Sequence, residues 1–276
     1  MDTLEFRRSG RRWQAALHSP FDLAITMEFD GPQPRFFAAS AAVAEPLRAG
    51  AFTGDVAAGS SCMCGVYTLS PHCHGTHTEC VGHLTGDRTH VSALTPIPPA
   101  LAAVISVRPG PLGIISHDRP RLSAATDPVI TRAMLATAAA AWTGDPWTTL
   151  VVRTLPNEPS KACRAYQGPC PAPYFTADAM HWIVERDVTS LVVDLPSLDR
   201  ADDGGGLVAH HVYWGLAPGV RDAQLARRGH ALVTELAYIP SAAADGLYLL
   251  DLQVPAFGAD AAPSRPVIYP LQELAP

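Results

Sequence analysis

The sequence has 276 residues, of which 47% are hydrophobic and 17% are charged, so the chain can bury a sizeable core. Its formal net charge is −6 and its Lys and Arg residues form no cluster, which argues against a nucleic acid as partner. Because no apolar run reaches transmembrane length and the six cysteines suit a reducing compartment as thiols or metal ligands, we expect a soluble, cytoplasmic protein that binds no membrane.

The N-terminal quarter predicts an extension followed by two strands. Residues 1–20 are basic but lack the apolar core of a secretory signal, so we treat them as an N-terminal extension. Residues 21–27 and 65–69 alternate apolar and polar side chains, as strands with one buried face do. Cys62 and Cys64 are too close in sequence for two ligands of a tetrahedral zinc, so we expect them as small buried residues on one face of a strand.

Residues 71–83 are the most informative segment, because they hold four histidines, a glutamate and two cysteines. Imidazole, carboxylate and thiolate are the groups that bind transition metals. If the segment after Gly75 is extended, His77 and Glu79 share a face, because side chains alternate along a strand. His83 follows Glu79 by four residues and can return to that face in one helical turn. The segment therefore predicts a metal site.

The rest of the chain alternates strands and helices, which indicates an α/β layered domain. Ala-rich residues 128–142 and residues 176–186 predict helices, with Thr176 as an N-cap, and residues 222–228 predict a short helix. Strands are expected at 101–107, 149–153, 190–193, 231–236 and 247–254. The intervening Pro/Gly/Asp-rich segments read as loops, so residues 1–276 are expected to form a single domain.

Four motifs, in this order, resemble the metal-dependent cyclase and hydrolase family, which includes bacterial kynurenine formamidases, isatin hydrolases and some polyketide cyclase-like proteins. The family signature is H-x-G-T-H-x-D-x₃-H, and this chain has G-T-H-T-E at 75–79 followed by His83. The other three motifs are P-Y-F-T at 173–176 with D-L-P-S-L-D at 194–199, H-H-V-Y-W at 210–214, and T-E-L at 234–236. The resemblance spans roughly residues 21–269 and implies a swivelling β/β/α fold with a half-open barrel.

The resemblance also implies a role for each matching residue. His77, Glu79, His210 and Glu235 would bind a divalent metal, Zn²⁺ or Mn²⁺. His83 would transfer protons as a catalytic residue, with Glu235 as an alternative proton carrier. Asp194, Ser197 and Asp199 are expected to cap loops or to support the ligands rather than to bind the metal.

Two positions depart from the family pattern. The family's first histidine aligns with Cys73, which is flanked by His72 and His74. Cys73 keeps the parity of His77 and Glu79, whereas imidazole from His72 better suits a carboxylate-rich site, so either residue is a candidate ligand. Glu79 replaces the family's aspartate and extends the carboxylate by one methylene. Both changes indicate a divergent member with its own substrate.

The expected function is hydrolysis of an amide, lactam or lactone carbonyl by metal-bound hydroxide, on carbon–nitrogen bonds other than peptide bonds. The alternatives are a cyclase or dehydratase in a polyketide-like biosynthetic pathway, and a metal-containing binding subunit without catalysis. The partner is expected to be a small-molecule substrate, and the protein a homodimer or homotetramer. The aromatic residues Tyr174, Phe175, Tyr213 and Trp214 either line the substrate pocket or pack in the core.

Overall fold

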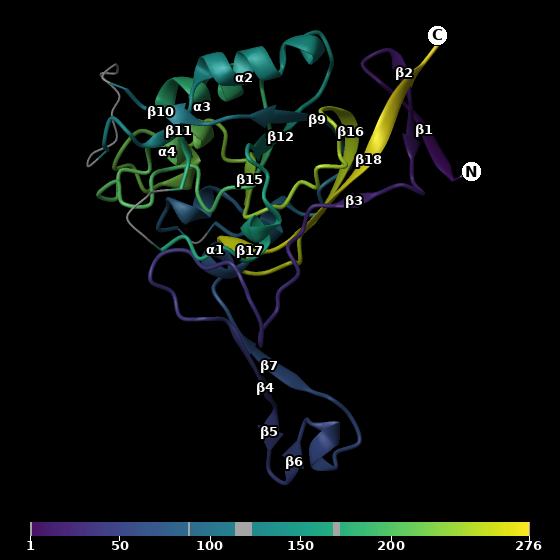
Figure 1. Ribbon diagram of the computed structural model, residues 1–276, viewed down its shortest axis with the longest axis vertical. Coiled ribbons are helices and arrows are strands. Elements are labelled where there is room, and N and C mark those ends of the chain that lie inside the picture. The colour runs from purple at the N-terminus through teal and green to yellow at the C-terminus, as the bar shows by residue number, and fades with distance from the viewer. Residues whose placement is uncertain (1, 88, 114–122, 168–171, 276) are drawn as a thin grey trace.

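A computed structural model describes residues 2–87, 89–113, 123–167 and 172–275, and it shows a large mixed sheet covered on one face by helices (Figure 1). The strands of this sheet run in the order β1-β2-β18-β16-β9-β12-β14-β15-β8-β17, and β3 also pairs with β18. Their bounds are β1 (Thr3–Arg8), β2 (Arg11–Ala16), β3 (Phe21–Asp22), β8 (His77–Glu79), β9 (Ala100–Val107), β12 (Thr149–Thr154), β14 (Ser190–Val193), β15 (Leu232–Glu235), β16 (Gly246–Gln253), β17 (Ala261–Pro263) and β18 (Arg265–Leu274). The expected α/β class is confirmed.

The centre of the sheet is parallel and buried on both faces. Strands β9, β12, β14 and β15 pair in parallel, which explains their continuous apolar sequences. Along β9, Leu101, Ala103 and Ile105 contribute to the core beneath the helices, whereas Ala102 and Val104 contribute to the core on the other face. The expected strands at 101–107, 149–153 and 190–193 are therefore confirmed. They form the centre of the sheet, and β15 and β8 follow them in the strand order.

Three helices cover one face of the sheet: α2 (Arg132–Ala138), α3 (Ala177–Glu185) and α4 (Val208–Trp214) (Figure 1). Helix α3 begins after Thr176, as expected. The expected helix at 128–142 is shorter, because β-branched Val129 and Ile130 extend a small sheet of β10 (Gly110–Pro111), β11 (Pro128–Ile130) and β13 (Tyr174–Phe175). Thr131 then caps α2 by accepting a hydrogen bond from the Met134 N–H. Residues 222–228 form only a 3₁₀ turn at Ala223–Leu225.

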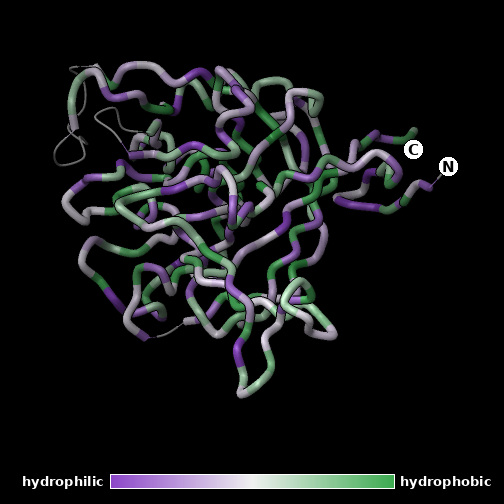
Figure 2. The backbone as a smooth tube through the Cα atoms, turned by 60° about the horizontal axis from the view of Figure 1, so that its bottom comes forward, coloured by the Kyte–Doolittle hydropathy of each residue, from purple (hydrophilic) through white to green (hydrophobic). Residues whose placement is uncertain are grey.

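Both chain ends lie at the same edge of the sheet (Figures 1 and 2). Within the segment treated as an extension, residues 3–16 form the β1–β2 hairpin, and β2 pairs with β18. The expected strand at 21–27 ends at Asp22, and although the Leu23 N–H still donates to the Pro266 carbonyl of β18, the N–H groups after it bond elsewhere. The Ala24 N–H donates to the Asp22 carboxylate and the Ile25 N–H to Thr76 Oγ1.

Between β3 and the histidine-rich residues 71–83, the chain forms an arm that projects from the body of the protein (Figure 1). The arm consists of two antiparallel pairs, β4 (Val43–Pro46) with β7 (Gly65–Thr68) and β5 (Arg48–Ala49) with β6 (Phe52–Thr53). The prediction that Cys62 and Cys64 are buried is wrong: Cys62 is exposed and Cys64 is half-buried, since the arm carries them away from both cores. None of the helices in the described parts of the chain is long and apolar enough to cross a membrane.

Candidate metal centre

The site is built on β8, a three-residue strand held between β15 and β17. Both neighbours are antiparallel to β8, and Glu235 of β15 lies opposite His77. Strand alternation therefore places His77, Glu79 and Glu235 on one face of the sheet. Thr78 points to the other face, where its hydroxyl bonds Thr234 Oγ1 at 2.7 Å and Ser264 Oγ at 2.8 Å. The hydroxyl contacts fix β8 in register and direct the ligand-type side chains toward α4.

Among the described residues, two polar atoms on this face are buried without a hydrogen-bond partner. His77 donates from Nδ1 to the Gly75 carbonyl at 2.9 Å, which leaves Nε2 bare and 3.5 Å from Glu235 Oε2. Glu79 is fully buried, and its Oε2 also makes no hydrogen bond. Buried polar groups are almost always paired, so two bare acceptors facing one cluster mark a position for a cation.

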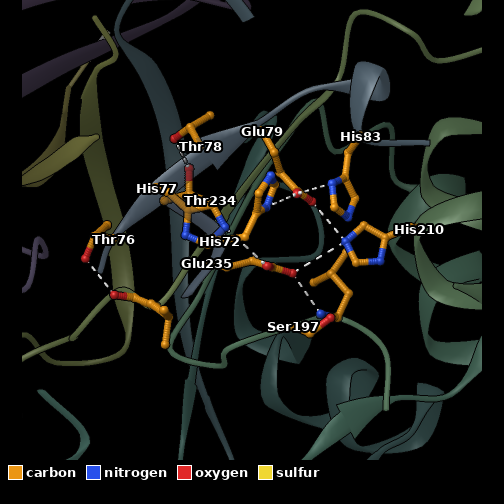
Figure 3. Close-up of polar contacts among 12 residues, drawn as sticks. His72, Thr76, His77, Thr78, Glu79, His83, Ser197, His210, Thr234 and Glu235 are labelled. Atoms are coloured by element: carbon orange, nitrogen blue, oxygen red, sulfur yellow. Dashed lines mark hydrogen bonds and ion pairs between the residues drawn. The ribbon is translucent and has the colours of Figure 1, made fainter. Parts of the chain in front are cut away.

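Helix α4 supplies the second half of the site (Figure 3). His210 Nε2 lies 2.9 Å from Glu79 Oε1 and 3.5 Å from Glu235 Oε1. His210 Nδ1 contacts Asp199 Oδ2 at 2.6 Å, and the same carboxylate accepts the Ala209 N–H at 2.7 Å. When Nδ1 of His210 donates to Asp199, its Nε2 faces the carboxylates of Glu79 and Glu235. A proton or a metal ion must then lie between Nε2 and these carboxylates.

His72 and His83 close the solvent side of the cluster. His72 belongs to α1 (Pro71–His74), and its Nδ1 lies 3.2 Å from Glu79 Oε2. His83 ends a 3₁₀ turn after β8, with Nδ1 3.7 Å from Glu79 Oε2. Both imidazoles contact Asp260 Oδ2, at 3.0 Å from His72 Nε2 and 3.3 Å from His83 Nδ1. These two side chains remain about one-quarter exposed, at 23% and 26%.

Protonated imidazoles balance the carboxylates in the metal-free site. Burial raises the pKa of Glu79, but the positive charges of His83 and His210 outweigh it and hold that pKa well below its usual range. Burial likewise disfavours the charged form of His210, yet Glu79 and Asp199 raise its pKa well above the usual value. For His72, the hydrogen bond to Asp260 and the negative charge of Glu79, whose Oε2 lies 3.2 Å from Nδ1, overcome burial and raise the pKa to about 10. A bound cation would take the place of these protons.

The donor set fits a divalent transition metal. Three groups of described residues bring their ligand atoms within 4.8 Å of one another, which suits a shared ion. They are His72 with His77 and Glu79, His72 with His83 and Asp260, and Glu79 with His83 and His210. Imidazole nitrogen with carboxylate oxygen is the donor combination of Zn²⁺ and Mn²⁺ enzymes.

The two cysteines of the motif lie outside these groups. Within the described residues, no candidate metal-binding group includes Cys73, whose carbonyl accepts the Phe36 N–H. Burial raises the pKa of Cys80 to about 11, so this residue remains a thiol. His74 is buried and bonded to backbone, with Nε2 donating to the Ser40 carbonyl at 2.6 Å. Of His72, Cys73 and His74, therefore, only the side chain of His72 reaches the carboxylates of Glu79 and Asp260 in the described structure.

The structure also places the residues expected to support the ligands, and it decides between the pocket and the core for the four aromatic residues. Asp199 holds His210, and Asp194 is a buried partner of Lys161 at 2.7 Å, so both support rather than bind. His211 turns from the site and contacts the Leu216 carbonyl at 3.1 Å. The four aromatic residues considered for a pocket lie in the core instead: Tyr174, Phe175, Tyr213 and Trp214 are at most 2% exposed.

An apolar cavity of about 580 Å³ opens beside the metal centre. Its lining combines three aromatic rings, Phe29, Tyr67 and Phe257, with His72 and Asp260. Sequence patterns did not mark Phe29, Tyr67, Phe257 or Asp260, because the arm, the N-terminal loop and the segment before β17 meet only in the folded chain.

The chain matches the family model described as "Putative cyclase" over residues 21–200. It belongs to the cyclase family. No curated protein matches the chain in sequence. The match ends before His210 and Glu235, so their place beside Glu79 rests on the geometry given above.

Solved structures share this fold at low sequence identity. A novel cyclase is 16% identical with a TM-score of 0.61, and the alignment covers 92% of this chain and 89% of that one. Isatin hydrolase A from Labrenzia aggregata is 14% identical, with a TM-score of 0.59 and coverage of 91% and 93%. A "predicted metal-dependent hydrolase" from Bacillus stearothermophilus is also 14% identical, with a TM-score of 0.54 and coverage of 91% and 98%. The cyclase-family fold expected from the motifs is thereby confirmed.

Proposed function

We propose that the protein is a metal-dependent hydrolase that cleaves an amide, lactam or lactone carbonyl, in the class that acts on carbon–nitrogen bonds other than peptide bonds. The observation that carries the proposal is the pair of bare buried acceptors, His77 Nε2 and Glu79 Oε2, facing His210 and Glu235. The isatin hydrolases that share the fold act on a cyclic amide carbonyl of the kind proposed here.

His72, His77, Glu79, His210 and Glu235 would hold Zn²⁺ or Mn²⁺. A divalent metal there supplies Lewis acidity, which polarises a carbonyl and makes water more acidic.

The protein's own groups fix the orientation of these ligands. Asp199 holds His210 by Nδ1, and the Gly75 carbonyl holds His77 by Nδ1, so both present Nε2 to the same place. Glu235 is fixed by the Leu198 N–H, which donates to its Oε1 at 2.8 Å. Such fixed donors keep the reacting groups in one geometry and leave little reorganisation for the reaction itself.

His83 is the proposed proton carrier. Its Nδ1 contacts Asp260, while its Nε2 makes no hydrogen bond within the described parts of the chain. The ring is 26% exposed, so Nε2 can exchange protons with solvent. In this role it takes a proton from the attacking water and returns it to the leaving nitrogen or oxygen. Glu235, which is almost fully buried, is the less accessible alternative.

The cavity beside the site supports a neutral, apolar substrate. Its lining contains three aromatic rings and no Lys or Arg, and its charged groups, His72 and Asp260, lie at the metal centre. An aryl or alkyl group would therefore be buried against the rings while its carbonyl faces the ligands. A substrate that carries a free carboxylate would find no Lys or Arg among the lining residues, and the imidazole of His72 already contacts Glu79 and Asp260.

A substrate panel with metal analysis tests the proposal. Protein purified without chelator should contain Zn or Mn by elemental analysis, and it should hydrolyse neutral aryl formamides, lactams or lactones faster than carboxylate-bearing analogues. Cyclisation or dehydration of polyketide mimics without any hydrolysis would favour the cyclase reading instead. A folded protein that binds metal but turns over no member of the panel would favour a binding subunit, and a metal-free protein that stays active would refute the metal centre.

A further inference from the structure

Asp260 lies outside every motif, yet its carboxylate is part of the metal centre. It directly precedes β17, and the Cys80 N–H donates to its carbonyl at 3.0 Å. This backbone bond fixes Asp260 across from the end of β8. From there Oδ2 reaches His72 Nε2 at 3.0 Å and His83 Nδ1 at 3.3 Å. The position of the carboxylate therefore depends on strand pairing and not on a flexible side chain alone.

The contact with Asp260 determines which way the His72 ring faces. An imidazole has two nitrogens. When one of them donates its proton to a hydrogen bond, the other keeps a free lone pair that can bind a metal. Nε2 of His72 is taken by Asp260, and Nδ1 points inward, 3.2 Å from Glu79 Oε2. The ring also packs edge-on against His77, with centroids 5.0 Å apart. Nδ1 of His72 thus faces the same place as the bare His77 Nε2 and Glu79 Oε2.

His72 needs such support because it comes from a weak element. Helix α1 has four residues, and its N-cap Ser70 makes no side-chain cap hydrogen bond. The His72 side chain is 23% exposed, so packing alone does not fix its rotamer. The buried ligands His77 and His210 are oriented by a carbonyl and by Asp199, respectively.

We propose that Asp260 is a positioning residue that holds His72 by Nε2 so that Nδ1 binds the metal, and that this pair replaces the histidine that the family motif places at position 73. The proposal rests on the metal centre proposed above. Asp260 accepts the proton of Nε2, as outer partners of metal-bound histidines commonly do. Cys73 is then free of any ligand role, in keeping with its absence from the candidate groups of the described residues.

Cobalt(II) binding to four variants tests the pair. The variants are Asp260→Ala, Asp260→Asn, His72→Ala and the double variant His72→Ala with Asp260→Ala. Asp251→Ala on β16 is the control, because within the described residues the Asp251 side chain bonds only that of Gln253. Affinity is measured by competition with a chromophoric chelator, and the visible spectrum of the bound cobalt reports its ligand geometry. Circular dichroism of each metal-free variant establishes that it is folded.

Asp260→Ala should weaken cobalt binding by about 10–100-fold and change the cobalt spectrum, because the His72 ring loses its orientation. Asp260→Asn should recover most of the affinity, since the amide oxygen still accepts the Nε2 proton. Because Asp260 acts through His72, the double variant should bind no more weakly than His72→Ala alone.

Three results would overturn the inference. Unchanged affinity in Asp260→Ala would show that His72 needs no partner. A loss in the double variant equal to the product of the two single losses would show that Asp260 is itself a ligand, for example with His83. Wild-type protein that binds no cobalt would refute the metal centre as a whole, whereas the first two outcomes leave the proposed function intact.

Discussion

Replacing His83 with alanine separates proton transfer from metal binding. The substitution removes a ring that is 26% exposed and that packs against His72 at 4.4 Å between centroids. It leaves the backbone bond from the His83 N–H to the Cys80 carbonyl in place, so the turn after β8 should persist. Because the buried ligand atoms lie elsewhere, we expect metal content and thermal stability close to those of the wild type.

The expected loss is in turnover. A general acid or base contributes about 10²–10⁴ in rate, or roughly 3–5 kcal/mol of transition-state stabilisation. Since solvent reaches the His83 ring, water can occupy the vacated space and carry part of the proton traffic, so we place the loss at about 10²–10³.

The assay compares kcat/KM and metal content for His83→Ala and for His181→Ala, which removes an exposed histidine from α3. His181→Ala should match the wild type in both measurements. Parallel loss of metal and activity in His83→Ala would identify His83 as a ligand, and unchanged turnover would move the proton path to Glu235 or to solvent.

Three further predictions concern the metal ligands. Glu79→Gln should weaken metal binding by more than the roughly 10–100-fold typical of outer partners, whereas His211→Ala should have little effect; chelator competition that ranks them otherwise would contradict the ligand assignment. The cobalt protein should lack the strong charge-transfer band of a thiolate ligand, and Cys73→Ala should leave its spectrum unchanged; a band lost in that variant would make Cys73 the ligand. Despite burial, Asp260 and Glu79 raise the pKa of metal-free His72 to about 10, so metal must displace a proton there, and Glu79 and Asp199 also raise the pKa of His210 well above its usual value. Affinity should therefore rise at least tenfold per pH unit through neutrality in a competition titration. A pH-independent affinity would argue against His72 as a ligand.

Local sequence patterns predicted the central strands and the half of the site that lies on one strand. Apolar runs identify β9, β12 and β14, because both of their faces are buried. Alternation in an extended segment is enough to place His77 and Glu79 on one face. Glu235 stands out because a carboxylate in an apolar strand needs a buried partner.

The features that local sequence patterns missed depend on pairing between strands far apart in the sequence. Asp260 sits among Gly258, Ala259 and Ala261, and nothing local distinguishes it from a loop aspartate. It reaches the site because β17 pairs with β8. The helix expected at 128–142 begins late for a similar reason, since the edge of β13 offers Val129 and Ile130 a ladder that outweighs their helical spacing.

The choice between His72 and Cys73 shows a limit of alignment by motif. Parity with His77 favoured Cys73 on the assumption that the chain is extended through residue 73. In the structure, residues 71–74 instead form a helical turn, in which neighbouring side chains diverge by about 100° rather than alternate. The chain is extended only after Gly75, so the parity argument does not apply to residue 73. His72 reaches the carboxylates in place of Cys73.

The position of β8 has a consequence for biosynthesis. In the described parts of the chain, this early strand pairs with β15, which carries Glu235, and with β17, which directly follows Asp260, and both are translated long after β8. At about 5–20 residues per second, a ribosome needs on the order of ten seconds or more between His77 and Glu235, and longer to reach Asp260. Throughout that interval the histidine-rich segment of the nascent chain lacks the partners that would hold it in place. The full set of ligands therefore exists only after Glu235 and Asp260 have been translated, and until then the imidazoles and thiols of residues 71–83 lack these partners.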